Sequence, residues 1–147
     1  MATLKFTDGA TLFRPRLICS LLSHRPILIR NIRPDSLTSP GLQDHEASFL
    51  RLLDKITNGT KIEINTTGTQ LRFFPGVLIG GTHDHTCPNS RGIGYFLEGI
   101  LPLGPFGKQA LRVTLEGVTD GKEDLDPSPD YFATSILPLL PLFGVGR

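Results

Sequence analysis

Three adjacent residues that could perform acid–base chemistry, Asp44, His45 and Glu46, follow a Pro-Gly turn and open a run of apolar residues at helical spacing. One carboxylate could orient the imidazole while the other transfers a proton. Adjacent residues on a helix point about 100° apart, however, so these side chains are not expected to converge. Acidic residues in a first turn also suit the helix dipole. The pattern therefore favours the polar start of a helix.

A second cluster, from His83 to Cys87, contains residue types that bind zinc. A tetrahedral zinc site needs four ligands, usually from two separated pairs, and the remaining histidines, His24 and His45, stand alone in the sequence. We therefore expect a loop with incidental histidines and a cysteine, and no metal site.

Gly92-Ile93-Gly94 precedes a predicted helix and has Arg91 beside it. The stretch forms neither a complete dinucleotide-binding fingerprint nor a P-loop, so it is weak evidence for a nucleotide site. The start of a helix can still offer free N–H groups to a phosphate. Anion binding at this position stays open beside the simpler interpretation as an ordinary loop.

Arginines form the most informative set of side chains. Arg14 and Arg16 open the first predicted helix, and Arg30 and Arg33 bracket the end of the second predicted strand, so all four can share one edge of an α/β layer. A forked guanidinium suits phosphate better than an ammonium does. On the residues alone, a rim of solvated arginines is equally possible. The acidic stretch from Glu116 to Asp130 is expected to remain solvated.

Hydrophobic periodicity predicts the elements that position these residues in the first half of the chain. They are a strand over Thr3–Thr7, a helix over Thr11–Ser23 with Pro15 in its first turn, a strand over Pro26–Ile32, a helix over Leu42–Thr57, and a hairpin of Lys61–Asn65 and Gln70–Phe74. The order predicts a β-α-β-α-β-β unit over residues 1–75.

A similar order begins again after Pro75. We expect a strand over Val77–Ile79, a loop from Gly80, a helix over Ile93–Leu103, a strand over Ala110–Val118, and a helix over Asp130–Phe143 that Pro138 and Pro141 disturb. This second unit, residues 76–147, lacks a closing hairpin. The prediction is an α+β fold of one complete and one incomplete unit in one compact domain, part of a longer chain, with apolar surface left exposed.

Composition narrows the class of protein. The chain has 147 residues, 39% of them hydrophobic, which suffices for one domain with a core, and its net charge of +1 does not by itself indicate a polyanion partner. Cys19 and Cys87 do not support a disulfide scaffold, and Cys19, in an apolar run, is expected to be a buried thiol. The sequence shows no signal peptide and no apolar stretch of the ~20 residues that a membrane span needs, so a soluble intracellular protein is expected.

Motifs spread over the chain resemble those of a known family. Asp8-Gly9, an arginine ahead of Pro26, Pro40-Gly41-Leu42, FFPGVLIGG and GVTD follow one another as in RNA 3′-terminal phosphate cyclases, and the resemblance runs from about Phe6 to Val145. The segments CPNSRGIGYFLEGILPLGPF and SILPLLPLFGV are most similar to the N-terminal portion of the eukaryotic cyclase-like branch. The resemblance implies repeated β-α-β-α-β-β units packed around a common axis.

Departures from the cyclase pattern bear on activity. Cyclases carry an acidic, glycine-rich loop after the first strand, where this chain has Ala10-Thr11-Leu12-Phe13. Arg14 stands at the position of a cyclase arginine. After the Pro-Gly turn, the cyclases carry a basic residue, a glutamine and a histidine, where this chain has Asp44, His45 and Glu46. The two carboxylates would repel a phosphate. The family's nucleophilic histidine belongs to a region beyond Arg147. The resemblance therefore implies no catalytic residue, no cofactor and no metal in this chain.

The cyclase-like branch is non-catalytic in cyclisation, and the resemblance implies a scaffold that acts in pre-rRNA processing and 18S rRNA maturation within the small-subunit processome. It further implies a place in the nucleus and nucleolus, with pre-rRNA, a ribosome-assembly GTPase and other processome proteins as partners, and no membrane. The expected RNA phosphate contacts are Arg14, Arg16, Arg30, Arg33 and Arg91. The alternatives are a working RNA 3′-terminal phosphate cyclase, a pre-rRNA endonuclease, or a structural module that touches only proteins.

Overall fold

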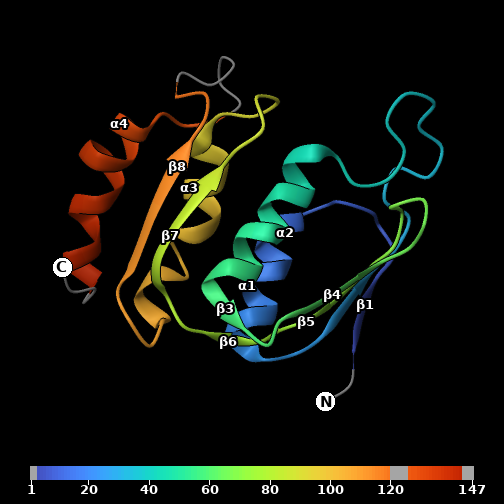
Figure 1. Ribbon diagram of the computed structural model, residues 1–147, viewed down its shortest axis with the longest axis horizontal. Coiled ribbons are helices and arrows are strands. Elements are labelled where there is room, and N and C mark those ends of the chain that lie inside the picture. The colour runs from blue at the N-terminus through green and yellow to red at the C-terminus, as the bar shows by residue number, and fades with distance from the viewer. Residues whose placement is uncertain (1–2, 120–125, 144–147) are drawn as a thin grey trace.

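A computed structural model describes residues 3–119 and 126–143. The first half of the chain builds a four-stranded sheet, whose strands in spatial order are β1 (Leu4–Phe6), β2 (Ile27–Ile29), β5 (Leu71–Phe74) and β4 (Lys61–Ile64). β1 runs parallel to β2, and the other neighbours are antiparallel. Helices α1 (Phe13–Ser23) and α2 (Asp44–Ile56) cover one face of this sheet (Figure 1). No helix of the described residues covers its other face.

Alternation along the strands decides which side chains enter the core of the first sheet. Ile27 and Ile29 of β2 and Leu71 and Phe73 of β5 are buried against the helices. The residues between them point to the opposite face. Pro15 stands in the first turn of α1, where its missing N–H costs no helical hydrogen bond. The predicted strands, helices and hairpin of the first half are all present.

The second half of the chain forms a smaller layer beside the first. β7 (Gly81–Thr86) runs parallel to β8 (Leu111–Glu116), and α3 (Ile93–Ile100) connects them, followed by a 3-10 turn at Gly104–Phe106. The side chain of Phe49 on α2 lies so close to Gly99 that any larger residue there would collide with it. Phe49 thus packs against α3, and one hydrophobic core runs through both halves.

One prediction for the start of the second half is confirmed and one is wrong. The predicted strand at Val77 is present as β6 (Val77–Leu78), which pairs with β3 (Thr57–Asn58), directly after α2, and not with the second sheet. The stretch after Gly80, predicted as a loop, contains β7. The inward positions of β7 are Gly81, His83 and His85, so the strand lacks the aliphatic alternation that marks its neighbours.

The last described segment is helical but irregular, as its prolines predict. It comprises α4 (Pro129–Tyr131), a π-helical stretch (Phe132–Ile136) and a 3-10 stretch (Leu137–Phe143). Phe132 is buried, whereas Tyr131, Leu137, Leu139 and Leu142 are exposed. These exposed side chains give the segment an apolar surface.

The α+β class is confirmed, and the first half has the predicted β-α-β-α-β-β order apart from the short β3. The boundary between the two units near residue 75 stays a prediction. Cys19 is exposed, contrary to the predicted buried thiol, because it lies on the face of α1 turned away from Leu17 and Leu21. Cys87 is buried, and burial raises the pKa of its thiol to about 11. No helix in the described part of the chain is long and apolar enough to cross a membrane.

Candidate functional site

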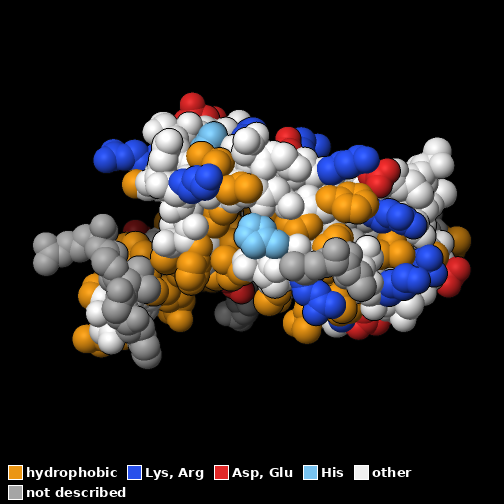
Figure 2. Space-filling model, turned by 90° about the horizontal axis from the view of Figure 1, so that it is seen from below, with side chains coloured by type: hydrophobic (Ala, Val, Ile, Leu, Met, Phe, Trp, Pro, Cys, Tyr) orange, Lys and Arg blue, Asp and Glu red, His pale blue; other side chains and the backbone are white. Residues whose placement is uncertain are grey.

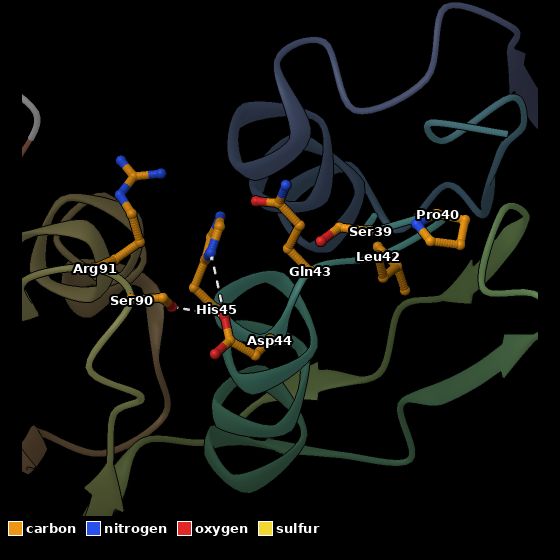
Figure 3. A pocket seen from close by; sticks show the side chains of 8 residues that line it. All are labelled: Ser39, Pro40, Leu42, Gln43, Asp44, His45, Ser90 and Arg91. Atoms are coloured by element: carbon orange, nitrogen blue, oxygen red, sulfur yellow. Dashed lines mark hydrogen bonds and ion pairs between the residues drawn. The ribbon is translucent and has the colours of Figure 1, made fainter. Parts of the chain in front are cut away.

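A cleft of about 590 Å³ opens where the start of α2 faces the turn before α3. Its lining residues are Ser39, Pro40, Leu42, Gln43, Asp44, His45, Ser90 and Arg91. The side chains of His45 and Arg91 approach this space from opposite sides (Figure 3). The cleft thus joins two of the sequence features singled out above, the acid–histidine–acid cluster and the arginine beside Gly92.

The three residues of the acid–histidine–acid cluster diverge, as the helix geometry predicts. α2 begins at Asp44, whose exposed carboxylate accepts a hydrogen bond from the Ser90 hydroxyl at 2.6 Å. His45 is buried beside Tyr95, with ring centroids 5.0 Å apart in an edge-to-face arrangement. Glu46 turns back to accept the Gln43 backbone N–H at 2.9 Å, which caps the helix. The prediction of a helix start is confirmed.

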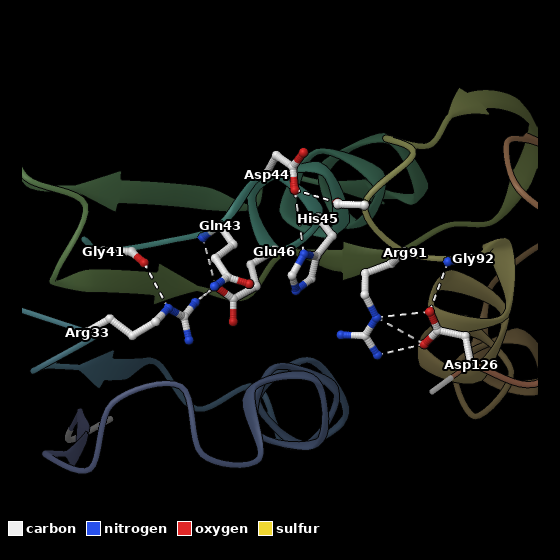
Figure 4. A network of polar contacts seen from close by, with 10 residues as sticks. Arg33, Gly41, Gln43, Asp44, His45, Glu46, Arg91, Gly92 and Asp126 are labelled. Carbon is white, nitrogen blue, oxygen red and sulfur yellow. Dashed lines mark hydrogen bonds and ion pairs between the residues drawn. The ribbon is translucent and has the colours of Figure 1, made fainter. Parts of the chain in front are cut away.

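Glu46 is the buried partner of Arg33. The Arg33 guanidinium donates to the Glu46 carboxylate and, through Nε, to the Gly41 carbonyl at 3.2 Å (Figure 4). Only 6% of the Glu46 side chain is exposed, so the guanidinium is the charge that compensates this carboxylate. A phosphate bound by Arg33 would have to compete with Glu46 and leave a buried carboxylate unpaired.

The surroundings of His45 favour the neutral form of its side chain. Burial lowers its pKa and the nearby Arg91 adds to that effect, while the Glu46 and Asp44 carboxylates oppose it. Its Nδ1 lies 3.6 Å from the Asp44 carboxylate and has no hydrogen-bond partner among the residues that the structure describes. An uncharged, poorly partnered imidazole offers phosphate no positive charge.

Arg91 is held by Asp126, a residue from the far side of the acidic stretch. The guanidinium makes a forked contact with the Asp126 carboxylate, at 2.9 Å through Nε and 2.6 Å through Nη2, and the Gly92 N–H donates to the same carboxylate at 2.9 Å. Burial alone would raise the pKa of Asp126, but these hydrogen bonds bring it below its ordinary value. A side chain at Gly94 would collide with the Pro127 carbonyl, so the chain after Asp126 packs directly on the start of α3.

The anion-binding position considered at Gly92 is therefore occupied by the protein's own carboxylate. The expectation that the whole acidic stretch is solvated is wrong for Asp126, whose side chain is 2% exposed. Asp120, Glu123 and Asp124 lie outside the described residues. Sequence reasoning missed Asp126 because nothing in its local pattern distinguishes it from its acidic neighbours.

Two of the remaining predicted arginines also have internal contacts. Arg14 donates to the Tyr95 carbonyl at 2.9 Å and stacks on the Tyr95 ring, 4.1 Å from its centroid, with Arg91 4.6 Å from the same centroid. Arg16 makes a forked contact with Asp8, at 2.7 and 2.9 Å. Arg30 is exposed, and within residues 3–119 and 126–143 its side chain has no hydrogen bond or ion pair. The cleft therefore gathers Arg91 with Arg14 nearby, while Arg16 and Arg30 lie elsewhere.

The two histidines of β7 make contacts within the protein, and His85 joins the two halves. His85 is buried, its Nε2 lies 2.8 Å from the Ser48 hydroxyl, and its Nδ1 lies 3.0 Å from the Lys55 ammonium. His83 contacts the Gly80 carbonyl at 2.7 Å. Among the described residues, no three His, Cys, Asp or Glu side chains are grouped so that they could hold a metal ion.

The geometry defines an α+β protein with two β-α-β layers and a polar cleft whose arginines are largely neutralised from within. Residues 6–146 match the family model described as RNA 3′-terminal phosphate cyclase, and the chain belongs to this family.

Curated relatives agree with this assignment. The chain is 54% identical over 97% of its length to the probable RNA 3′-terminal phosphate cyclase-like protein of Dictyostelium discoideum. It is 53% identical over 93% of its length to the RNA 3′-terminal phosphate cyclase-like protein of Homo sapiens, and 40% identical over 94% to the rRNA processing protein RCL1 of Saccharomyces cerevisiae. These matches cover 38%, 36% and 37% of the relatives, so the chain spans little more than a third of their length.

Proposed function

We propose that this chain acts in pre-rRNA processing as a non-catalytic scaffold, in the nucleolus, within the small-subunit processome and on the path to 18S rRNA. Its partners would be pre-rRNA, a ribosome-assembly GTPase and other processome proteins. The names of the fungal relatives, which are rRNA processing proteins, support the general role. The finer assignments rest on the resemblance to the cyclase-like branch.

One observation carries the non-catalytic part of the proposal. The cleft presents the Asp44 carboxylate and a neutral His45, while the Arg33 and Arg91 guanidiniums are bound to Glu46 and Asp126. A phosphate entering the cleft would meet negative charge first and would have to displace internal partners. These features favour a scaffold over a site that holds an RNA 3′-phosphate and ATP.

The five arginines predicted to contact RNA remain proposals. Arg30 is the strongest candidate, because its exposed guanidinium can meet a phosphate without breaking an internal contact. Arg14, Arg16, Arg33 and Arg91 would each have to give up the hydrogen bonds described above. We therefore expect Arg30→Ala to weaken RNA binding more than Arg16→Ala does, without loss of stability.

A matched pair of RNA oligonucleotides, one ending in a 3′-phosphate and one in a 3′-hydroxyl, tests the proposal on the 147-residue chain. A scaffold should bind both with the same affinity and should not bind ATP with Mg²⁺, as measured by titration calorimetry. A preference for the 3′-phosphate, tight ATP binding or cleavage of a pre-rRNA fragment would overturn the non-catalytic assignment.

Charge reversal at Asp44 tests whether the negative charge of the cleft keeps phosphate out. Asp44→Lys places a cation at the cleft and should create a preference for the 3′-phosphate oligonucleotide. Asp54→Lys, an exposed reversal further along the same helix, is the matched control and should create none. Equal behaviour of the two variants would mean that the cleft has no part in excluding phosphate.

A further inference from the structure

We propose that the outer face of the first sheet, the face turned away from α1 and α2, is a binding platform for single-stranded RNA. The proposal rests on the proposed function and names the surface that would contact the RNA. The platform is defined by Lys5 on β1, Arg30 after β2, Arg72 and Phe74 on β5, and Lys61 on β4. Arg30 alone belongs to the set predicted from the sequence.

Strand register places these side chains on one surface. Lys5 pairs with Leu28, Leu28 with Arg72, and Arg72 with Glu63, so the four residues form a row across the sheet. Lys61 pairs with Phe74 in the adjacent row. Arg30 stands two residues beyond Leu28 on the same strand path, since its N–H still donates to Phe6 of β1.

Burial indicates which way this surface points. The alternate residues of the same strands, such as Ile27, Ile29 and Phe73, belong to the hydrophobic core, whereas Lys5, Arg72 and Lys61 are exposed. Leu28, which shares the outer face with them, is buried without belonging to that core. Viewed from the side opposite the helices, this half of the molecule shows Lys and Arg side chains around apolar ones (Figure 2).

The cations of the platform are not held by hydrogen bonds or ion pairs within residues 3–119 and 126–143. None of Lys5, Arg30, Lys61 and Arg72 has a side-chain hydrogen bond or ion pair with any residue that the structure describes. Glu63 is the one carboxylate in the two rows. Four exposed cations thus stand against one carboxylate on this face, and the surplus of positive charge favours an anionic partner.

An aromatic ring among these cations favours single-stranded RNA over an acidic protein. Phe74 is half-buried on the outer face, and the Lys61 ammonium lies 5.7 Å from its ring centroid. Exposed aromatic faces stack on unpaired bases, and flanking cations follow the phosphate chain, which is how sheet surfaces and basic grooves bind single strands. A duplex, with its bases stacked inside, cannot use this ring.

The second sheet provides an internal contrast. Its outer face carries Thr82, Asp84 and Thr86 of β7 and Arg112, Thr114 and Glu116 of β8, which pair across the two strands. One cation there stands against two carboxylates, and these positions include no aromatic residue. The basic, aromatic character therefore belongs to the first sheet and is not a general property of exposed strands in this protein.

Fluorescence anisotropy with a labelled single-stranded RNA tests the platform on the 147-residue chain. Lys5→Ala, Lys61→Ala and Arg72→Ala should each lower the salt dependence of binding, by about 0.7 in the slope of log K against log salt concentration for each phosphate that is no longer neutralised. Phe74→Leu, which keeps an apolar side chain, should weaken binding about tenfold because stacking is removed. Arg112→Ala is the matched control, an exposed strand arginine on the other sheet, and should change nothing.

Each outcome decides a different point. Unchanged affinity in all the platform variants, with wild-type binding intact, would overturn the platform and leave the proposed function standing. Failure of the wild-type chain to bind any RNA would overturn both. Competition by polyglutamate as effective as by RNA, with no effect of Phe74→Leu, would assign the surface to an acidic protein and overturn the RNA platform. Thermal unfolding of every variant checks that altered binding does not reflect a loss of folded structure.

Discussion

The charged residues around the cleft are held by contacts within the protein, whereas those of the RNA platform are exposed to solvent. Around the cleft, Arg33 and Arg91 are each bound to a buried carboxylate, and Asp126 also accepts the N–H of Gly92, the residue before α3. On the platform, the Lys5 and Arg72 side chains are exposed and bind no described residue. Both regions are rich in arginine, so residue type alone does not distinguish them.

The difference teaches that a cation's surroundings decide whether it can serve a ligand. A guanidinium that compensates a buried carboxylate is part of the folded structure, and removing either partner leaves an uncompensated charge. A solvated cation contributes little to stability and keeps its full charge for a partner. Substitutions in the cleft should therefore change stability, whereas substitutions on the platform should change binding.

The largest effect is expected for Asp126→Ala. The change removes three hydrogen bonds from Arg91 and one from Gly92, and it leaves a guanidinium that is only 17% exposed without a counter-charge. Breaking a buried pair on one side costs about 3 to 5 kcal/mol, and partial access of Arg91 to water reduces this to about 2 kcal/mol. Urea denaturation measures the decrease in the free energy of unfolding.

Arg72→Ala is the control for that comparison. It removes an exposed cation with no described partner, and the free energy of unfolding should change by less than about 0.5 kcal/mol. A decrease at Arg72 equal to the decrease at Asp126 would mean that the two regions do not differ as described. So would an Asp126→Ala protein as stable as the wild type.

The pH dependence of stability should also come from buried titratable side chains and not from the platform. Burial lowers the pKa values of His45 and His85 below the ordinary 6.5, with Arg91 adding to the effect at His45 and Lys55 and Arg51 at His85. As the pH falls below 6.5, the unfolded chain takes up protons that the folded chain does not, so stability decreases until the lower folded pKa values are reached. Below about 3.8, protonation of Asp126 should cause a further decrease, because its folded pKa is lowered.

Two variants, His45→Gln in the cleft and Arg72→Ala on the platform, show which region determines the pH dependence of stability. The first should flatten part of the decrease between neutral and mildly acidic pH, since one of the two histidines with lowered pKa values is gone. The second should leave the profile of unfolding free energy against pH unchanged. A profile that changes with Arg72 and not with His45 would contradict the assignment.

Local pattern predicted the strands and helices of the first half because each carries a clear apolar alternation or helical spacing, as in Ile27–Ile29 and in α2. It failed at β7, whose inward residues are a glycine and two histidines. It identified the arginines but not their partners, because the contacts of Arg91 with Asp126 and of Arg14 with Tyr95 join residues 35 and 81 positions apart. The charge of the platform was equally hidden, since it depends on which strands become neighbours.

The smallest effect is expected for Ser90→Ala, at the rim of the cleft. The Ser90 hydroxyl donates to Asp44, and this hydrogen bond is the main cause of the lowered pKa of Asp44. Because 64% of the Asp44 side chain is exposed, water can replace the hydroxyl, and the free energy of unfolding should change by less than about 0.5 kcal/mol. The pKa of Asp44, followed by NMR titration, should nevertheless rise toward its ordinary value. A decrease in stability as large as that of Asp126→Ala would contradict this expectation, because an exposed contact would then cost as much to remove as a buried one.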